Sequence, residues 1–490
     1  QQSPARHLER GICGGIRDVT HQMYQQLNVD RILLPELLAD VATAAATERE
    51  SRPRSRVVST SDPSRAGDFT LPRQGIGAAA ALEQVLNRVV PNLPVVGGPR
   101  YLGFVTGGAT PAAMIGDWLT TLVDQNPISS LDGAVPLAIE QQTAAMVREL
   151  LDLPSDLHGS YVTGATMSNF VGLALGRQWI GHQKGVDVAA SGSAVVPGAQ
   201  ILSGAAHSSI AKASAMLGFG RSNVVRLPTV PGREAIELDG LAAALERAAE
   251  PVIVVANAGT VNTGDFDDVR GIVQLKQEFD FWLHVDAAFG GFAAVSPGLA
   301  DQLDGWTAAD SLCVDLHKWL NVPYDSALVF TRYPELQTEV FANSAAYLGG
   351  RDAPTSPIDM VPENSHRWRA LPVLCTLLAY GAEGYREIVE RDCGLARELG
   401  ELIDSSSQFE LLAEVRLNVV CFTLVGWTSQ EQVAAFVAAA RDGGRVFVTP
   451  TVLEDRPAVR AAFCNWEMTR EDLAEVWQAL LAAAERVGDQ

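Results

Sequence analysis

Two residues in the middle of the chain have the types and positions that suit chemistry on a carbonyl compound. Lys318, in the segment 315–320 (DLHKWL), lies just beyond the apolar run 311–314, and Asp286 ends the run of residues 281–286 (FWLHVD). A lysine beyond a buried strand can form an imine with an aldehyde, and we expect its positive and apolar neighbours to lower its pKa. A buried carboxylate can keep a ring nitrogen protonated. Both residues could instead have ordinary roles, the lysine as a solvated surface charge and the aspartate as a helix cap.

The segment 161–169 (YVTGATMSN) is typical of a strand, a tight turn and the start of a helix. Backbone N–H groups at Ala165 and Thr166, together with the threonine hydroxyl, would form an anion site at such a helix start. The same residues could also serve only as a helix cap. The segment is not a Walker loop, because the Gly-Lys-Ser/Thr ending is missing.

Two further residues stand beside expected loops. His207 follows the apolar run 200–202, and Tyr347 opens a stretch rich in Pro and Gly at residues 349–365. His207 could cap the next helix or face a ligand, and Tyr347 could pack against neighbours or close over a site. The sequence has no HExxH, no Cys/His cluster with zinc spacing and no Gly-x-Ser-x-Gly, so we expect neither a metal site nor a serine hydrolase.

Composition narrows the class of protein and its partners. The chain has 490 residues and a net charge of -21 at pH 7, and such a charge repels nucleic acids and anionic membrane surfaces. Hydrophobic residues at 47% and charged residues at 19% indicate a well-buried globular enzyme of two or three domains. Six cysteines without a CxxC pair, and no apolar segment of membrane-spanning or signal-peptide type, lead us to expect free thiols and a cytoplasmic protein.

Short apolar runs alternate with helical stretches between about residues 100 and 332. The runs are residues 160–162, 200–202, 251–256, 281–285, 311–314 and 327–330. Buried strands separated by helices predict an α/β fold with a mostly parallel sheet that is covered on both faces. We expect an N-terminal helical segment at residues 1–98, a large domain at residues 99–370 and a small C-terminal α/β domain at residues 371–490.

The flanking segments predict further elements. Residues 1–50 are expected to be helical, with an amphipathic stretch at 30–38, and residues 51–69 are typical of an exposed connector. Beyond the loop at 349–365, residues 371–389 predict a long helix. The C-terminal segments 414–422 and 444–448 predict strands.

Taken together, these motifs resemble those of the group II decarboxylases, which use pyridoxal phosphate (PLP) and include aromatic amino-acid, glutamate and tyrosine decarboxylases. The resemblance covers about residues 100–463 and rests on HVDAA at 284–288, HK at 317–318, His207, Tyr347 and the extension LNVPYDS at 320–326. It implies the PLP-dependent transferase fold of type I, which is like that of aspartate aminotransferase. It also implies a homodimer with active sites at the subunit interface and an N-terminal segment that wraps over the partner.

The resemblance implies a role for each matching residue. Lys318 would bind the PLP aldehyde, Asp286 would hold the proton on the pyridine nitrogen, and Ala288 would lie under the ring. His207 would stack on the ring and assist proton handling, and Tyr347 would protonate the substrate Cα. The remaining cofactor contacts would come from Ala165, Thr166, His317 and Thr260. His284 is expected to be structural.

Two positions depart from the family pattern. Relatives often have two threonines after Gly259, whereas the second position here is Val261. Asp315 stands where some relatives have Asn beside the phosphate, and a carboxylate there would repel the phosphate unless it faces away or is neutralised. We therefore expect His317 rather than Asp315 to neighbour the phosphate.

The resemblance implies decarboxylation of an L-amino acid to an amine and CO2. Residues 101–108 (YLGFVTGG) match the family's substrate-side segment and offer aromatic and apolar surface, with Arg100 as the only nearby charge. We therefore favour an aromatic or bulky apolar substrate. The rival substrate is an acidic amino acid, such as glutamate, aspartate or cysteine sulfinate, bound by Arg100 or another arginine.

The reaction itself could also be a different one. An aminotransferase or an aldehyde synthase could use the same fold, and a PLP-binding protein could lack catalysis. An aminotransferase would clamp the α-carboxylate with an arginine, for which Arg369, Arg416 and Arg460 are the candidates. A non-catalytic protein is disfavoured, because Lys318, Asp286, His207 and Tyr347 are present together.

Overall fold

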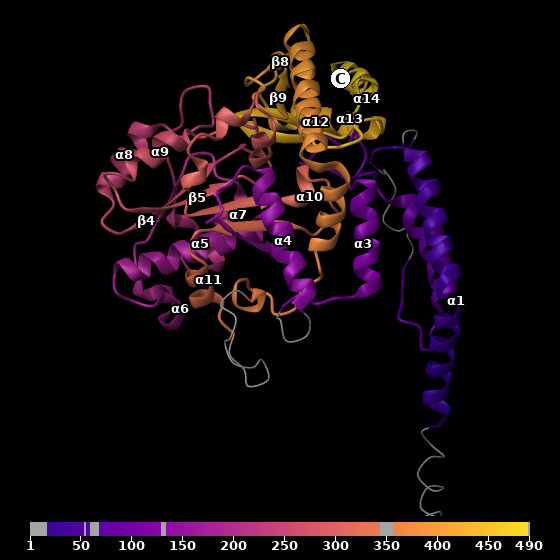
Figure 1. Ribbon diagram of the computed structural model, residues 1–490. Coiled ribbons are helices and arrows are strands. Elements are labelled where there is room, and N and C mark those ends of the chain that lie inside the picture. The colour runs from indigo at the N-terminus through magenta and orange to yellow at the C-terminus, as the bar shows by residue number, and fades with distance from the viewer. Residues whose placement is uncertain (1–16, 53–54, 59–67, 129–133, 344–355, 489–490) are drawn as a thin grey trace, which may run out of the picture. The chain divides into compact units, whose positions relative to one another are not determined.

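The computed structural model describes residues 17–52, 55–58, 68–128, 134–343 and 356–488 (Figure 1). The chain forms two compact units, Gln1–Val96 and Gly97–Gln490. Tyr347 lies outside the described residues, as do part of the expected connector at 51–69 and part of the loop at 349–365.

The first unit is helical, as residues 1–50 predict. Its helix α1 (Arg17–Ser51) contains residues 30–38, whose Ile32, Leu34 and Leu38 are exposed. The short segments α2 (Ala78–Gln84), η4 (Val85–Val89) and η5 (Val90–Asn92) follow. Asp30 Oδ1 accepts a hydrogen bond from the Ala78 N–H at 3.1 Å, which ties α1 to the start of α2.

The second unit is built on a seven-stranded sheet with the order β1-β7-β6-β5-β4-β2-β3. Its strands are β1 (His158–Val162), β2 (Ile201–Ser203), β3 (Val224–Arg226), β4 (Val252–Asn257), β5 (Phe281–Asp286), β6 (Ser311–Asp315) and β7 (Ala327–Thr331). Neighbours from β3 to β6 are parallel, whereas β7 is antiparallel to both β6 and β1. All six apolar runs of the sequence form strands. The three-residue β3 was missed, because its run is too short to show a pattern.

The large sheet is covered on both faces, as predicted. Val252, Val254 and Ala256 on β4 belong to one core cluster, with residues of α8, α9 and α12. Ile253 and Val255 belong to another, with residues of α5 and α7. Alternate residues of a strand point to opposite faces, so the two clusters lie on opposite sides of the sheet (Figure 1).

The helices of this unit have the following bounds. The α-helices are α3 (Pro111–Val123), α4 (Ala134–Leu150), α5 (Ala165–Gln183), α6 (Val188–Ser191), α7 (Ser208–Met216), α8 (Leu238–Arg247), α9 (Val269–Leu275), α10 (Leu316–Trp319), α11 (Pro334–Phe341), α12 (Ala370–Asp404), α13 (Gln430–Gly443) and α14 (Arg470–Gly488). The 3-10 turns are η6 (Ser193–Val195), η7 (Arg221–Asn223), η8 (Gly290–Val295), η9 (Ala300–Leu303), η10 (Trp306–Ala308) and η12 (Pro357–Asp359). None of the described helices is long and apolar enough to cross a membrane.

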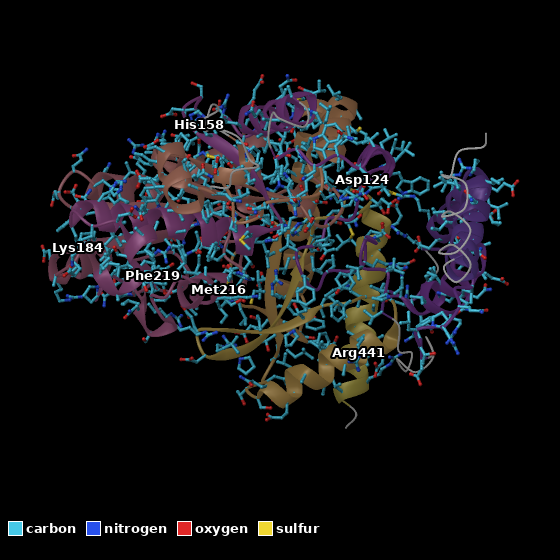
Figure 2. All side chains as sticks on the ribbon, turned by 90° about the horizontal axis from the view of Figure 1, so that it is seen from below. Asp124, His158, Lys184, Met216, Phe219 and Arg441 are labelled. Carbon is cyan, nitrogen blue, oxygen red and sulfur yellow. The ribbon has the colours of Figure 1, made fainter. Side chains whose placement is uncertain are left out.

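A second, antiparallel sheet forms the C-terminal part of the same unit. Its order is β10-β11-β9-β8, with β8 (Phe409–Leu411), β9 (Val419–Leu424), β10 (Thr449–Leu453) and β11 (Arg456–Ala462). The predicted helix at 371–389 lies in α12, which runs on to contact β8 and β9 and bends at Gly381, where φ is 58°. Figure 2 shows Arg441, in the last turn of α13, apart from Met216, which ends α7, and from Phe219, which follows it.

The predicted strand at residues 414–422 overlaps β9. The predicted strand at residues 444–448 is wrong except at Phe447, which forms an isolated parallel β-bridge with Tyr101. The next strand begins only at Thr449. Phe447 instead exchanges backbone hydrogen bonds with the distant segment 100–102, since its N–H donates to the Arg100 carbonyl and its carbonyl accepts from Leu102. Residues 444–448 therefore link the start of the second unit, near residue 101, to the small sheet.

Candidate active site

A cavity of about 350 Å³ lies at the carboxyl ends of the parallel strands β4, β5 and β6. In open α/β sheets this edge is the usual ligand site, because loops and helix starts converge there. Every predicted site residue that the structure describes lines the cavity; these are Ala165, Thr166, His207, Thr260, Asp286, Ala288, His317 and Lys318. Folding thus brings segments that are far apart in the sequence to one site.

Lys318 lies on the one-turn helix α10, directly after β6. Its Nζ is 3.0 Å from Asp315 Oδ2 and 5.5 Å from the centre of the Phe289 ring. Burial lowers the pKa of Lys318, but the carboxylates of Asp315 and Asp286 raise it, and the net direction is upward. The prediction of a lowered pKa is therefore wrong, because the lysine faces two acids rather than other cations.

For Asp315 the sequence left two possibilities, that its carboxylate faces away from the site or that it is neutralised there. Its Oδ1 accepts a hydrogen bond from the Ala165 N–H at 2.7 Å, at the first residue of α5. The same oxygen is 3.5 Å from His317 Nε2. The carboxylate thus lies in the cavity, and Lys318 together with the positive end of a helix dipole neutralises it.

Asp286 is buried at the end of β5, and both of its carboxylate oxygens accept hydrogen bonds. Its Oδ2 accepts from Asn169 Nδ2 at 2.8 Å, and its Oδ1 accepts from the Ala288 N–H at 3.2 Å. Asn169 was not identified from the sequence. It stands four residues after Ala165 on α5, so both lie on the same helix face, and this spacing could have revealed it.

The two predicted histidines differ in how the fold holds them. His207 both caps α7, through a hydrogen bond from the Ser209 N–H to Nδ1, and lines the cavity, so the cap and the ligand contact are compatible roles. His317 Nδ1 accepts from the Ser326 N–H at 3.2 Å, and its ring packs on Tyr324 at 4.4 Å between centres. Burial is the main cause that lowers the pKa of both histidines, and this favours their neutral forms.

Thr260 lines the cavity, but its hydroxyl is already engaged. It donates to Glu234 Oε2 at 2.6 Å, and Thr263 donates to the same oxygen at 2.8 Å. Glu234 is buried and also accepts from Asn262. The Thr260 hydroxyl also accepts from the Asp265 N–H at 3.0 Å, and the Thr260 N–H donates to the Asp265 carbonyl at 2.8 Å. A contact between Thr260 and the cofactor therefore stays a prediction.

Arg460, on β11 of the small sheet, is the candidate arginine that reaches the cavity. Its Nη1 donates to the Gly103 carbonyl at 3.0 Å, whereas Nε and Nη2 are buried without a partner among the described residues. Burial lowers its pKa to about 10, which leaves it charged at neutral pH. A buried cation with two free donors is suited to a carboxylate from a bound molecule.

The remaining candidate arginines do not line this cavity. Arg100 pairs with Glu475 at 2.7 Å, Arg369 pairs with Asp325 at 3.1 Å, and Arg416 lies 3.6 Å from Asp265 and also pairs with Glu414. The idea that Arg100 binds an acidic side chain therefore loses support, and Arg460 takes its place as the arginine that could bind one.

Comparison with known proteins agrees with this site. The model of the pyridoxal-dependent decarboxylase conserved domain matches residues 78–425. The chain is 26% identical over 434 residues to an aromatic-L-amino-acid decarboxylase of Bacillus atrophaeus, and the match covers 85% of the chain and 88% of the relative. It is 27% identical over 423 residues to an L-2,4-diaminobutyrate decarboxylase of Rhizobium meliloti (strain 1021), where the match covers 84% and 83%.

A solved structure confirms the predicted fold of type I. The crystal structure of Oryza sativa TDC with PLP and tryptamine superposes with a TM-score of 0.86 at 19% identity, over 93% of this chain and 98% of that chain. The residues at the cavity also fit PLP chemically. Lys318 offers an amine and Asp286 offers a buried carboxylate. At the start of α5 the Ala165 N–H already donates to Asp315, so the backbone and hydroxyl of Thr166 are what the helix start offers to a phosphate.

Proposed function

Since the chain belongs to the pyridoxal-dependent decarboxylase family, we propose that it decarboxylates an L-amino acid with an aromatic or bulky apolar side chain. The observation that carries this proposal is the apolar part of the cavity wall. Phe104, Val105, Met167, Phe289 and Tyr324 line the cavity together with the charged residues. Contact with these residues favours an apolar substrate side chain.

The roles of the residues follow from their chemistry. PLP, when bound, supplies an electron sink for the bond between Cα and the carboxylate. Lys318 would hold the cofactor through its aldehyde group, and Asp286 would keep a proton on the pyridine nitrogen. Phe289 and Val105 exclude water, which favours loss of a charged carboxylate as neutral CO2. The roles of Ala288 under the ring, His207 on it, Ala165, Thr166 and His317 at the phosphate, and Tyr347 as proton donor to Cα are part of this proposal.

A second candidate function is decarboxylation of an acidic amino acid, and Arg460 is the observation that favours it. The guanidinium has two donors without a partner in the described chain, and it could bind either the α-carboxylate of any amino acid or the second carboxylate of an acidic one. An aminotransferase would instead retain the α-carboxylate against Arg460. The apolar wall makes us prefer an apolar substrate, and the family assignment makes us prefer decarboxylation to transamination.

The deciding experiment measures all products from a panel of amino acids. PLP-reconstituted protein would be incubated with tryptophan, tyrosine, phenylalanine, leucine, glutamate, cysteine sulfinate and 2,4-diaminobutyrate, and CO2, amine, keto acid, aldehyde and oxygen uptake would be measured. We expect equal amounts of CO2 and amine from the aromatic or bulky apolar members. Turnover confined to the acidic members would establish the second candidate, and keto acid without CO2 would establish an aminotransferase.

We also propose that the protein acts as a homodimer with interfacial sites. Light scattering coupled to gel filtration would give the mass, and a monomer with full activity would contradict this part of the proposal. Inactive Lys318→Ala and Tyr347→Ala chains, mixed with each other, should regain activity only if two subunits share one site.

A further inference from the structure

We propose that Asn169 and Ser209 form a hydrogen-bond relay that joins Asp286 to His207 and fixes the tautomer of His207. Both act as positioning residues. The roles of Asp286 and His207 toward the cofactor rest on the proposed function, whereas the relay itself rests on hydrogen bonds between side chains of the second unit.

Asn169 is fully buried on α5 and uses all of its amide. Its Nδ2 donates to Asp286 Oδ2 at 2.8 Å and to Ser209 Oγ at 2.9 Å, and its Oδ1 is 2.8 Å from His284 Nε2. A carboxylate only accepts, so the amide nitrogen must face Asp286 and the amide oxygen must face His284. The hydrogen on His284 is therefore on Nε2.

His284 holds the amide of Asn169 in this orientation. Ser311 Oγ accepts from Trp282 Nε1 at 3.1 Å, so its own hydrogen is free to donate to His284 Nδ1 at 2.8 Å. Burial lowers the pKa of His284 to about 4, despite the opposing effect of Asp286, so the ring is neutral and donates through Nε2. His284 is therefore structural, as expected, and its structural task is to orient Asn169.

Ser209 connects the amide of Asn169 to the imidazole ring of His207 by hydrogen bonds. Its Oγ accepts from Asn169 and lies 2.8 Å from His207 Nδ1. Because the Ser209 N–H already donates to Nδ1 at 3.2 Å, this nitrogen carries no hydrogen, and the Ser209 hydroxyl is the donor to it. With two donors on Nδ1, the ring hydrogen must be on Nε2, and the Nε2–H is the polar hydrogen that His207 can offer to a bound molecule.

The charges around His207 leave this assignment intact. Burial and the cations Lys318 and Arg460 lower its pKa, whereas the carboxylates of Asp286 and Asp315 raise it, and the net direction is downward. A proton added at Nδ1 would also face the two donors from Ser209. The relay thus opposes protonation of His207 and, at its other end, keeps a donor on the carboxylate of Asp286.

The test measures the tautomer and pKa of His207 directly. The full PLP-reconstituted chain would be labelled with ¹⁵N-histidine, the His207 signals would be assigned by comparison with His207→Gln, and the ring would be titrated by NMR. We expect the Nε2–H tautomer in the wild type. Ser209→Ala and Asn169→Ala should each raise the measured pKa by about 0.5–1, the equivalent of one hydrogen bond, whereas Ser209→Thr, which keeps the hydroxyl, should resemble the wild type.

Two further variants separate a relay from independent effects. Ser168→Ala removes a buried hydrogen bond of 2.9 Å to the Leu328 carbonyl from the same helix and should leave His207 unchanged. In the Ser209→Ala background, Asn169→Ala should add no further shift, because the link is already cut. An unchanged tautomer and pKa in Ser209→Ala, or an equal shift from Asn169→Ala in both backgrounds, would overturn the relay.

The readout also keeps this inference separate from the proposed reaction. The His207 titration needs no substrate. It can therefore contradict the relay while the product panel confirms decarboxylation, or support the relay while the product panel contradicts decarboxylation. Circular dichroism and melting temperature would identify a variant that does not fold. If Asn169→Ala proves to be one, the comparison of Ser209→Ala with Ser209→Thr still decides the question.

Discussion

Asp286 and Arg460 are both buried charges on the wall of one cavity, yet their surroundings differ. Asp286 receives hydrogen bonds from Asn169 and Ala288, and the side chains behind it are themselves oriented by further hydrogen bonds. Arg460 uses one donor on the Gly103 carbonyl and has two others without a partner in the described chain. The side of the cavity at Asp286, where the polar groups have hydrogen-bond partners, is suited to hold a permanent cofactor rigidly; we call it the satisfied side. The side at Arg460, where two donors lack partners among the described residues, is suited to a substrate group that binds and leaves; we call it the unsatisfied side.

The largest effect is expected at Lys318, which lies on the satisfied side through its pair with Asp315. Lys318→Ala should reduce kcat by at least about 10²–10⁴-fold, because it removes the amine that binds the cofactor and moves protons. Weak binding of PLP should remain. Steady-state release of CO2 would measure the loss, with the surface variant Lys184→Ala as control. Normal turnover of Lys318→Ala would remove the basis of the proposed function.

The next effect tests the unsatisfied side. Arg460→Met should raise KM by at least about 30-fold, since a substrate carboxylate would lose its buried partner. The free energy of unfolding should change by only about 1 kcal/mol, because the guanidinium now makes one hydrogen bond and leaves two donors unpaired among the described residues. Steady-state kinetics and denaturant unfolding would be measured together.

A matched control sharpens this test. Arg100→Met removes an equally buried guanidinium that is paired with Glu475 and does not line the cavity, so it should reduce stability and leave KM unchanged. If Arg460→Met instead destabilises the protein with no change in KM, Arg460 stabilises the fold and does not bind the substrate.

Asp315 should show a smaller effect, on the ionisation of Lys318. The two acids Asp315 and Asp286 raise the pKa of the lysine against the effect of burial. Asp315→Asn removes the acid that pairs with it, so the pKa of the Lys318 amine should fall, and the amine should become uncharged at a lower pH. Competitive acetylation of the PLP-free protein across pH, read by mass spectrometry, would measure this, with Lys184 as an internal reference. An unchanged Lys318 profile would mean that the ion pair at 3.0 Å does not control the amine.

The smallest effect concerns stability behind the site. Asp392 accepts from Trp319 Nε1 at 2.8 Å, and burial raises its pKa to about 8. A carboxyl whose folded pKa lies above its unfolded value stabilises the fold at low pH, and that contribution is lost as the pH rises towards about 8. Asp392→Asn should therefore flatten the pH dependence of unfolding between about pH 4 and 8. Urea unfolding at several pH values would show it, and the exposed variant Asp301→Asn should keep the wild-type slope.

The sequence alone was sufficient for the frame of the fold and for most of the site. The apolar runs predicted strands correctly, because a strand buried on both faces must be apolar throughout, and this is visible locally. Asp286 and Lys318 stand directly beyond two of those runs, so their position at one sheet edge followed from the parallel arrangement. Tyr347 lies outside the described residues, and its role stays a prediction.

Only the tertiary structure decided which groups meet. The pKa of Lys318 has the opposite direction from the prediction, because Asp315 turns towards it after the chain folds. Arg460 reaches the cavity from the small sheet, and Asn169 contacts Asp286, His284 and Ser209 from α5. Hydrogen bonds and charges act over a few ångströms between segments that are distant in the sequence, so no local pattern records them.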